Sequence, residues 1–209
     1  MSKKFLLFYT PLFILFVTFL ILPMLPKNHT PFSSEILKEQ DIQSSNWSQI
    51  SIVSETTLLS NTGDSNFPAI AVDSTGALHV VWRDWTDGWW GTDAEIMYAK
   101  YSTCGIWLNY TIISDDTTQW NTGDSDEPAI AVDTTGNVHV VWQDLTSGWW
   151  ETDSEIMYAN YTVGVGWSNA TVISDDATLW NTGNSFKPAI AVDGTGNVHV
   201  VWYDWTDGW

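Results

Sequence analysis

An internal repeat of sixty residues constrains the fold more than any other feature of this sequence. The hexapeptide Pro-Ala-Ile-Ala-Val-Asp begins at Pro68, Pro128 and Pro188. Residues 61–120 align with residues 121–180 without a gap, and 39 of the 60 positions are identical. A third copy begins sixty residues later. Repetition at such a period is typical of solenoids and propellers, in which each copy is one supersecondary unit.

Each copy is expected to contain four β-strands. In the first copy they are residues 68–73, 78–84, 95–101 and 107–114. These segments are rich in β-branched and aromatic residues, and Gly, Asp, Ser or Pro bounds them. Neither face of the first two strands is polar, which is typical of a sheet covered on both sides. No segment after the N-terminal region has a helical period.

This pattern predicts an all-β protein, a β-propeller of four-stranded antiparallel blades. A β-sandwich is the alternative, but it does not require near-identical units. The propeller region is predicted to span residues 46–209, with a lone fourth strand at 46–54, blades at 61–120 and 121–180, and a partial blade at 181–209.

About two and a half blades predict an open or incomplete ring, because closed propellers have roughly four to eight blades. Two explanations stay open. The chain is either a fragment of a longer protein or one part of a ring that several chains complete.

The N-terminus predicts export. Lys3 and Lys4 precede an apolar run, so residues 1–26 are expected to form a signal peptide or a signal-anchor helix. By the positive-inside rule the remainder lies outside the cell. Residues 27–45 are polar and are predicted to be a linker or stalk. We therefore expect a secreted or cell-surface protein that meets the membrane only through this segment. Asn-x-Ser/Thr sequons suit an exported glycoprotein, and they occur at Asn28, Asn46, Asn109, Asn160 and Asn169.

Charge and cysteine content exclude several classes. The formal net charge is −18, with 25 Asp and Glu against 7 Lys and Arg. Such a surface repels nucleic acid and anionic lipid, so nucleic acid is not expected as a partner. Solubility and cation binding are both compatible with the charge. Cys104 is the single cysteine, which excludes an intrachain disulfide and a cysteine zinc cluster.

The repeat resembles the sialidase-like β-propellers built from BNR or Asp-box repeats. The matching residues are Pro-Ala-Ile-Ala-Val-Asp at 68–73, His-Val-Val-Trp at 79–82, Asp84, and Glu-Ile-Met-Tyr at 95–98. The resemblance implies a propeller fold, and its superfamily holds both hydrolases and non-enzymatic modules. The Asp-box itself departs from the family pattern, because Cys104 lies near the expected position of its acid.

The resemblance also implies what a hydrolase would need. Family sialidases hold the substrate carboxylate with three arginines and use a Tyr–Glu pair and an Asp acid/base. This sequence has one arginine, Arg83, and the later copies carry Gln143 and Tyr203 at that position. We therefore expect a non-catalytic binding protein and name no catalytic residue. A fragment of a sialidase-like hydrolase and a purely structural surface repeat are the alternatives.

Two long loops of each copy are predicted to converge on one rim, because successive turns of an antiparallel sheet alternate between its ends. They are residues 85–94 and 115–127. Long loops on a rigid scaffold commonly carry function. Tryptophan faces stack on sugar rings, and Asp and Asn bind hydroxyl groups, so we expect a carbohydrate or cell-surface glycan ligand. The candidate ligand-binding residues are Trp85, Trp89, Trp90, Trp120, Asn121, Trp149, Trp150, Trp180, Asn181, Asp84, Asp87 and Asp144.

Calcium is a second possible ligand of this rim, because Ca²⁺ takes six to eight oxygen ligands. The candidate metal ligands are Asp93, Glu95, Asp124, Asp126, Asp153 and Glu155. Packing is the competing role for the aromatic residues, and Trp82, Trp142 and Trp202 inside the second strand are expected to be buried between blades.

A histidine recurs in the second strand of each copy. His79, His139 and His199 are expected to make one buried hydrogen bond per blade, with metal binding as the alternative. The aspartates that close the first strand, such as Asp73, are expected to accept protons from turn amides.

Overall fold

The structure of the chain is a computed structural model that describes residues 6–7, 51–54, 61–108, 110–115, 120–150, 152–175, 178 and 180–206. The predicted linker at residues 27–45 and nearly all of the predicted export segment lie outside this part. Two short strands precede the repeats, namely β1 (Leu6–Leu7) and β2 (Ser51–Ile52). None of the described residues belongs to a helix long and apolar enough to span a membrane.

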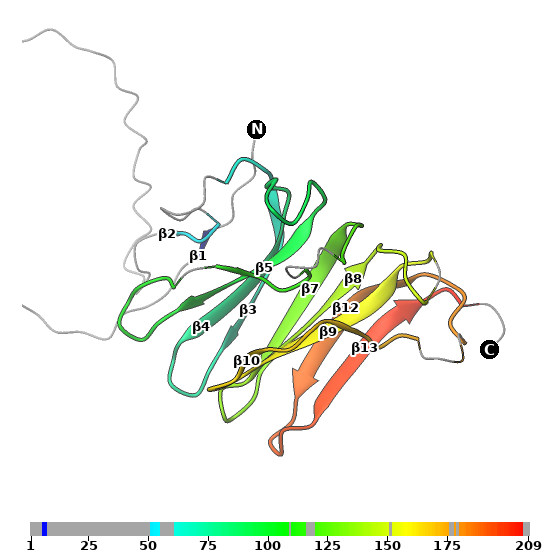
Figure 1. Cartoon of the computed structure of the whole chain (residues 1–209). Coiled ribbons are helices and arrows are strands. Elements are labelled where there is room, and N and C mark those ends of the chain that lie inside the picture. The colour runs from blue at the N-terminus through cyan, green and yellow to red at the C-terminus, as the bar shows by residue number, and fades with distance from the viewer. Residues whose placement is uncertain are drawn as a thin grey trace, which may run out of the picture. The chain divides into compact units, whose positions relative to one another are not determined.

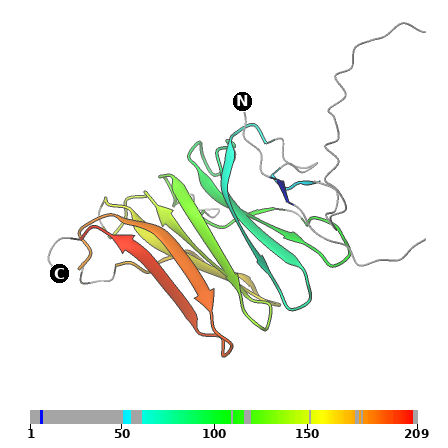
Figure 2. The same cartoon turned by 180° about the vertical axis from the view of Figure 1, so that it is seen from behind.

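The repeats form consecutive antiparallel sheets, which follow one another side by side in sequence order (Figures 1 and 2). Blade 1 contains β3 (Ser65–Val72), β4 (Leu78–Asp84), β5 (Glu95–Tyr101) and β6 (Thr111–Ile112). Blade 2 contains β7 (Ser125–Val132), β8 (Val138–Asp144), β9 (Glu155–Thr162), β10 (Gly166–Trp167) and β11 (Thr171–Val172). Blade 3 contains β12 (Ser185–Val192) and β13 (Val198–Asp204).

The all-β propeller prediction is confirmed, with about two and a half four-stranded blades in an incomplete ring. Each blade pairs its strands in sequence order, and the first strands β3, β7 and β12 lie beside one another. The predicted strands at 78–84 and 95–101 match β4 and β5 residue for residue.

The first strand of each blade begins earlier than expected because it carries a bulge. In blade 1 the β3–β4 register shifts between Asn66 and Ala69. Phe67 within this bulge has a φ of 51°, and its counterparts Glu127 and Lys187 have φ values of 48° and 50°. Non-glycine residues rarely adopt the left-handed region, so the same uncommon backbone recurs in all three blades.

The fourth strand is interrupted, whereas the sequence predicts one continuous segment. In blade 2, β10 and β11 both pair with β9. The Trp167–Tyr161 pair and the Thr171–Tyr158 pair differ in register by one residue. An extra residue between them breaks the ladder, as in a β-bulge.

The hydrophobic core lies within and between the blades. Val81 and Ile96 of blade 1 pack in one cluster with Val138, Val140 and Trp142 of blade 2, and all five are fully buried. Trp82 is also buried, as expected for a strand-two tryptophan, whereas Trp202 of blade 3 is only half-buried. Each such aromatic side chain removes roughly 150–250 Å² from water, which stabilises a fold without disulfides.

Candidate functional site

The predicted rim is held together by hydrogen bonds between consecutive blades. Ser125 N, at the start of β7, donates to Ala94 O in the β4–β5 loop at 2.7 Å. Ala94 N donates in turn to Asp124 Oδ1 at 3.1 Å. Blade 2 repeats the first bond to blade 3, from Ser185 N to Ser154 O. The loop after strand two therefore lies against the segment that opens the following blade.

A buried polar network lies under this rim. Asn121 Nδ2 donates to Ser125 Oγ at 2.9 Å and to Asp144 Oδ2 at 3.1 Å. Asp144 Oδ2 also accepts from Trp142 Nε1 at 3.0 Å, and Asp144 Oδ1 accepts from Thr146 N at 2.8 Å. Asn121 and Asp144 are 2% and 1% exposed. These two candidate ligand residues therefore bind other residues of the fold.

The same arrangement occurs at the other blades. Asn61 Nδ2 donates to Asp84 Oδ2 at 3.0 Å, and Asn181 Nδ2 donates to Asp204 Oδ2 at 3.1 Å. Asp84 is buried and also accepts from Trp82 Nε1 at 2.8 Å. Asp84 and Asn181 therefore join Asn121 and Asp144 as parts of the polar network.

Two glutamates extend this network into the preceding blade. Glu95 and Glu155 are fully buried. Oε2 of Glu95 accepts from Ser114 Oγ and, at 3.4 Å, from Asn121 Nδ2. Burial raises the pKa of Glu95 to about 9, opposed by the Ser114 hydrogen bond and assisted by the nearby charges of Asp93 and Asp115. A neutral carboxyl group at this position avoids an unpaired buried charge.

The second glutamate has the same surroundings. Glu155 Oε2 accepts from Ser174 Oγ and, at 3.2 Å, from Asn181 Nδ2. Burial raises the pKa of Glu155 to about 7, opposed by the Ser174 hydrogen bond and assisted by Asp153 and Asp175.

The candidate metal ligands do not gather at one point. Asp124 accepts from Ala94 N, and Asp126 forms an ion pair with Arg83. Within the described ranges, no three His, Cys, Asp or Glu side chains form a group that could hold a metal ion. The predicted calcium site therefore has no assembled ligand set in this part of the chain.

The Gly-Trp-Trp sequence of the rim loop divides into one buried and one exposed ring. Trp90 and Trp150 are 4% and 7% exposed, whereas Trp89 and Trp149 are 53% and 55% exposed. Trp150 Nε1 donates to Thr146 O at 3.0 Å, which fixes its orientation. Within each pair the rings meet edge to face, with centroids 5.6 Å apart in blade 1 and 5.5 Å in blade 2. The first tryptophan of each pair is therefore exposed, and the second is packed in the interior.

The remaining candidates lie apart from these pairs. Trp85 is half-buried beneath the Arg83 guanidinium, with 5.1 Å between the guanidinium carbon and the ring centroid. Asp87 is exposed on the rim, and Trp180 is 38% exposed.

Three candidate tryptophans line one pocket of about 380 Å³ on blade 2. Trp120, Trp149 and Trp150 form its aromatic walls, and Met157 and residues 169–172 complete it. We name this the flank pocket. The candidate binding residues predicted from the sequence did not include residues 169–172. Blade 1 carries Ser60 and Tyr110 where blade 2 has Trp120 and Ala170, and this difference between copies was the available signal.

A second pocket of about 380 Å³ lies between blades 2 and 3, and we name it the inter-blade pocket. Its lining residues are Asp126, Glu127, Gln143, Phe186, Lys187, Tyr203 and Trp205. Of these only Asp126 was a candidate residue. The signal was again in the repeat, because the positions of Phe186, Lys187 and Tyr203 differ in every copy while the flanking residues are largely identical.

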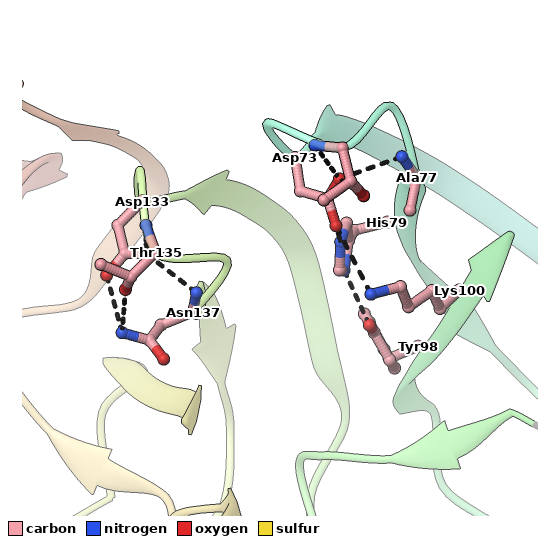
Figure 3. A network of polar contacts seen from close by, with 9 residues as sticks. Asp73, Ala77, His79, Tyr98, Lys100, Asp133, Thr135 and Asn137 are labelled. Carbon is pink, nitrogen blue, oxygen red and sulfur yellow. Dashed lines mark hydrogen bonds and ion pairs between the residues drawn. The ribbon is translucent and has the colours of Figure 1, made fainter. Parts of the chain in front are cut away.

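The opposite end of the blades carries turn-stabilising aspartates (Figure 3). Asp73 Oδ1 accepts from Thr75 N at 2.9 Å and Ala77 N at 3.0 Å, as expected from the sequence. Asp73 Oδ2 lies 3.2 Å from His79 Nε2, and His79 Nδ1 lies 2.8 Å from Tyr98 Oη. Burial lowers the pKa of His79, so its neutral ring donates to Asp73 and accepts from Tyr98.

The second blade arranges its turn differently. His139 Nδ1 lies 2.8 Å from Tyr158 Oη. Asn137 Nδ2 now donates to Asp133 Oδ2 at 2.8 Å (Figure 3). Asp133 Oδ1 still accepts from the turn amides of Thr135 and Asn137. His79 thus bonds both its turn and the neighbouring strand, whereas His139 bonds the strand and lies 3.8 Å from Asp133 Oδ2.

The comparisons with known proteins do not assign the chain to a family. No family model matches it, and no curated protein matches it. Several solved structures are similar in part, and three of them are described here. They are a Hadza microbial sialidase (15% identity, TM-score 0.44, 66% of this chain and 34% of that one), an endo-arabinase from Bacteroides thetaiotaomicron (12%, 0.43, 73% and 56%), and a thermostable family-43 glycoside hydrolase (12%, 0.44, 68% and 49%). The chain thus matches between about a third and somewhat over a half of their lengths.

Proposed function

We propose that this protein is an exported β-propeller that binds carbohydrate, and that the flank pocket is its sugar-binding site. The observation that carries the proposal is the meeting of Trp120, Trp149 and Trp150 around one cavity. The cavity lies within the size range of small-ligand sites, which combine apolar walls with a few polar groups.

The flank pocket has the chemistry that a sugar ring requires. Trp149 presents an exposed indole, while the buried Trp150 is fixed by its bond to Thr146 O. A rigid aromatic surface binds an apolar sugar face at little entropic cost. Thr171 is exposed in the same pocket and can exchange hydrogen bonds with hydroxyl groups.

Binding suits the described residues better than hydrolysis does. Arg83 is the single arginine of the sequence, and it is engaged by Asp126 and lies over the rings of Phe67 and Trp85. The buried acids Glu95 and Asp144 are bonded within the fold. Export to the cell surface rests on the apolar N-terminal segment of the sequence and belongs to the same proposal.

The test is a glycan array, followed by calorimetric titration of the purified protein with the best oligosaccharide. Trp149→Ala should weaken binding by about tenfold or more, because it removes an exposed stacking surface. Ala170→Tyr should also weaken it, because the pocket would receive the bulky residue that blade 1 carries. Trp89→Ala is the matched control, since Trp89 has the same exposure and the same edge-to-face partner in blade 1.

Three results would contradict the proposal. One is the absence of binding to any glycan. A second is equal loss in Trp89→Ala and Trp149→Ala, which would remove the assignment to the flank pocket. The third is turnover of a sialoside by the wild type, which would favour the hydrolase alternative.

A further inference from the structure

The inter-blade pocket contains three aromatic rings in mutual contact. Phe186 and Trp205 have centroids 4.7 Å apart at 69°, and Tyr203 and Trp205 have centroids 6.2 Å apart at 73°. The ring centroids of Phe186 and Tyr203 are also 6.2 Å apart. Tyr203 and Trp205 are 57% and 60% exposed. Because the Trp205 ring lies at steep angles to the rings of Phe186 and Tyr203, aromatic surfaces bound the pocket on more than one side.

The same pocket carries acidic side chains from the neighbouring blade. Asp126 and Glu127 follow the first residue of β7, and both line the pocket together with the amide of Gln143. Asp126 already pairs with Arg83, and Glu127 Oε2 accepts from Lys187 N at 3.1 Å. Lys187 is also part of the lining.

Blade 1 has a cation of the protein itself at the sequence position that Tyr203 occupies in blade 3. The Arg83 guanidinium carbon lies 5.2 Å from the Phe67 ring centroid and 5.1 Å from the Trp85 ring centroid. It also donates to Asp126 of the next blade. Aromatic faces and a carboxylate therefore surround a cation at the blade 1–blade 2 junction.

Blade 3 replaces that arginine by an aromatic residue. Tyr203 stands at the position of Arg83, while Trp205 keeps the ring of Trp85 and Phe186 adds a third ring. We propose that the inter-blade pocket binds an alkylated ammonium group from outside the chain, by cation–π contacts with these rings and attraction to Glu127. Rings that enclose a site on several sides suit a round ammonium group better than a planar guanidinium.

Tetramethylammonium chloride is the direct probe, titrated into the full chain by calorimetry at low salt. We expect saturable binding. The neutral isostere tert-butanol should bind at least about tenfold more weakly, because it lacks the charge that cation–π attraction requires. Equal affinity for the two probes, or no saturable binding of tetramethylammonium, would overturn the proposal.

Blade 2 supplies substitutions that the fold already accepts. Tyr203→Gln and Trp205→Leu introduce the residues found at Gln143 and Leu145. Each should weaken tetramethylammonium binding by about fivefold to tenfold. Trp149→Ala in the flank pocket is the control and should leave this binding unchanged. Unaltered binding in both blade-2-like variants would refute the site.

Two charge variants separate the roles of the pocket's own ionic groups. Glu127→Gln should weaken tetramethylammonium binding by removing a carboxylate. Lys187→Ala should leave binding unchanged or tighten it, because Lys187 lines the same pocket and its positive charge repels the probe. A loss of binding in Lys187→Ala would also overturn the proposal.

Discussion

Asn121 Nδ2 donates to Asp144 Oδ2 at 3.1 Å across 23 residues, and the same amide nitrogen lies 3.4 Å from Glu95 Oε2 of the preceding blade. One side chain therefore joins the opening of blade 2 both to the end of its second strand and to blade 1. We therefore expect the stability of the repeat array to depend on Asn121 more than on any exposed residue of the rim.

Asn121→Ala should lower the free energy of unfolding by about 3 kcal/mol, because it leaves several buried groups without partners. Urea denaturation of the purified protein measures this change. Asn197→Ala is the matched control, since that amide lies in an exposed turn of blade 3, and it should cost less than about 1 kcal/mol. Similar costs for the two variants would contradict the assigned role of Asn121.

Stability should fall as the pH rises from weakly acidic to weakly basic values. The folded-state pKa of Glu155 is about 7 and that of Glu95 about 9, above the ordinary value of 4.5. The folded protein thus keeps protons that the unfolded chain has released, so their contribution is complete below pH 4.5 and is lost as the pH passes through 7 and then 9. Urea midpoints at a series of pH values measure this slope.

The double variant Glu95→Gln, Glu155→Gln should show a flatter dependence over the same range. Repulsion among the remaining acids is nearly equal in both proteins, so the difference between the two curves isolates the glutamates. Parallel curves would show that neither glutamate keeps a raised pKa.

Acid should destabilise the protein through the turn aspartates. Side-chain bonds from Thr135 and Asn137 and turn amide bonds overcome the effect of burial and lower the pKa of Asp133 to about 2. Because this pKa lies below the ordinary value of 3.8, its contribution is present above pH 3.8 and is lost as the pH falls through 2. Asp133→Asn should reduce the loss of stability between pH 4 and pH 2, as followed by circular dichroism; an unchanged acid limb would refute the assignment.

Asp73→Ala should be more damaging than Asp193→Ala. Asp73 is 8% exposed and, besides its turn bonds, lies 3.2 Å from His79 Nε2 and 3.4 Å from Lys100 Nζ. Its loss should cost about 2 kcal/mol, because the buried histidine loses its acceptor. Asp193 makes the same turn and lies 3.4 Å from His199 Nε2, but both side chains are more exposed than those of Asp73 and His79, so its loss should cost less. Thermal denaturation of both variants tests the order, and a reversed order would contradict it.

Gly123→Ala should destabilise the rim by about 2 kcal/mol or more, because a Cβ there would lie 2.5 Å from the Leu145 carbonyl carbon. Gly194→Ala serves as the control. Nothing lies within 4 Å of a Cβ at that glycine, and the other copies carry Ser74 and Thr134 there. We expect the control to be neutral in urea denaturation, and a neutral Gly123→Ala would mean that the two backbones do not approach so closely.

The strands were predicted best where a segment of strand-forming residues is bounded on both sides by turn residues. β4 and β5 were predicted to the residue, since apolar and β-branched residues run between Gly, Asp and Glu boundaries. The bulge at Phe67 and the break between β10 and β11 were missed, because one extra residue in a strand leaves no mark in its composition.

The candidate site was harder to predict, because the residue type alone does not show whether an acidic side chain is exposed on the rim or buried beneath it. Asp87 and Asp144 are both aspartates near the same kind of loop, yet the first is exposed and the second holds Trp142 Nε1. The two tryptophans of each Gly-Trp-Trp sequence divide in the same way. Only the fold shows which ring turns inward and which positions of the repeat meet at a pocket.

The bond from Ser125 N to Ala94 O, and its counterpart from Ser185 N to Ser154 O, ties each blade to the one before it. Stability in such an array is the sum of intrinsic terms for each blade and coupling terms between nearest neighbours. A blade cut out at the repeat boundary would lose the coupling on both sides, including the Asn121–Glu95 contact. We therefore expect the smallest cooperative element to be two blades with the junction between them, so transplanted repeats should keep their junctions intact.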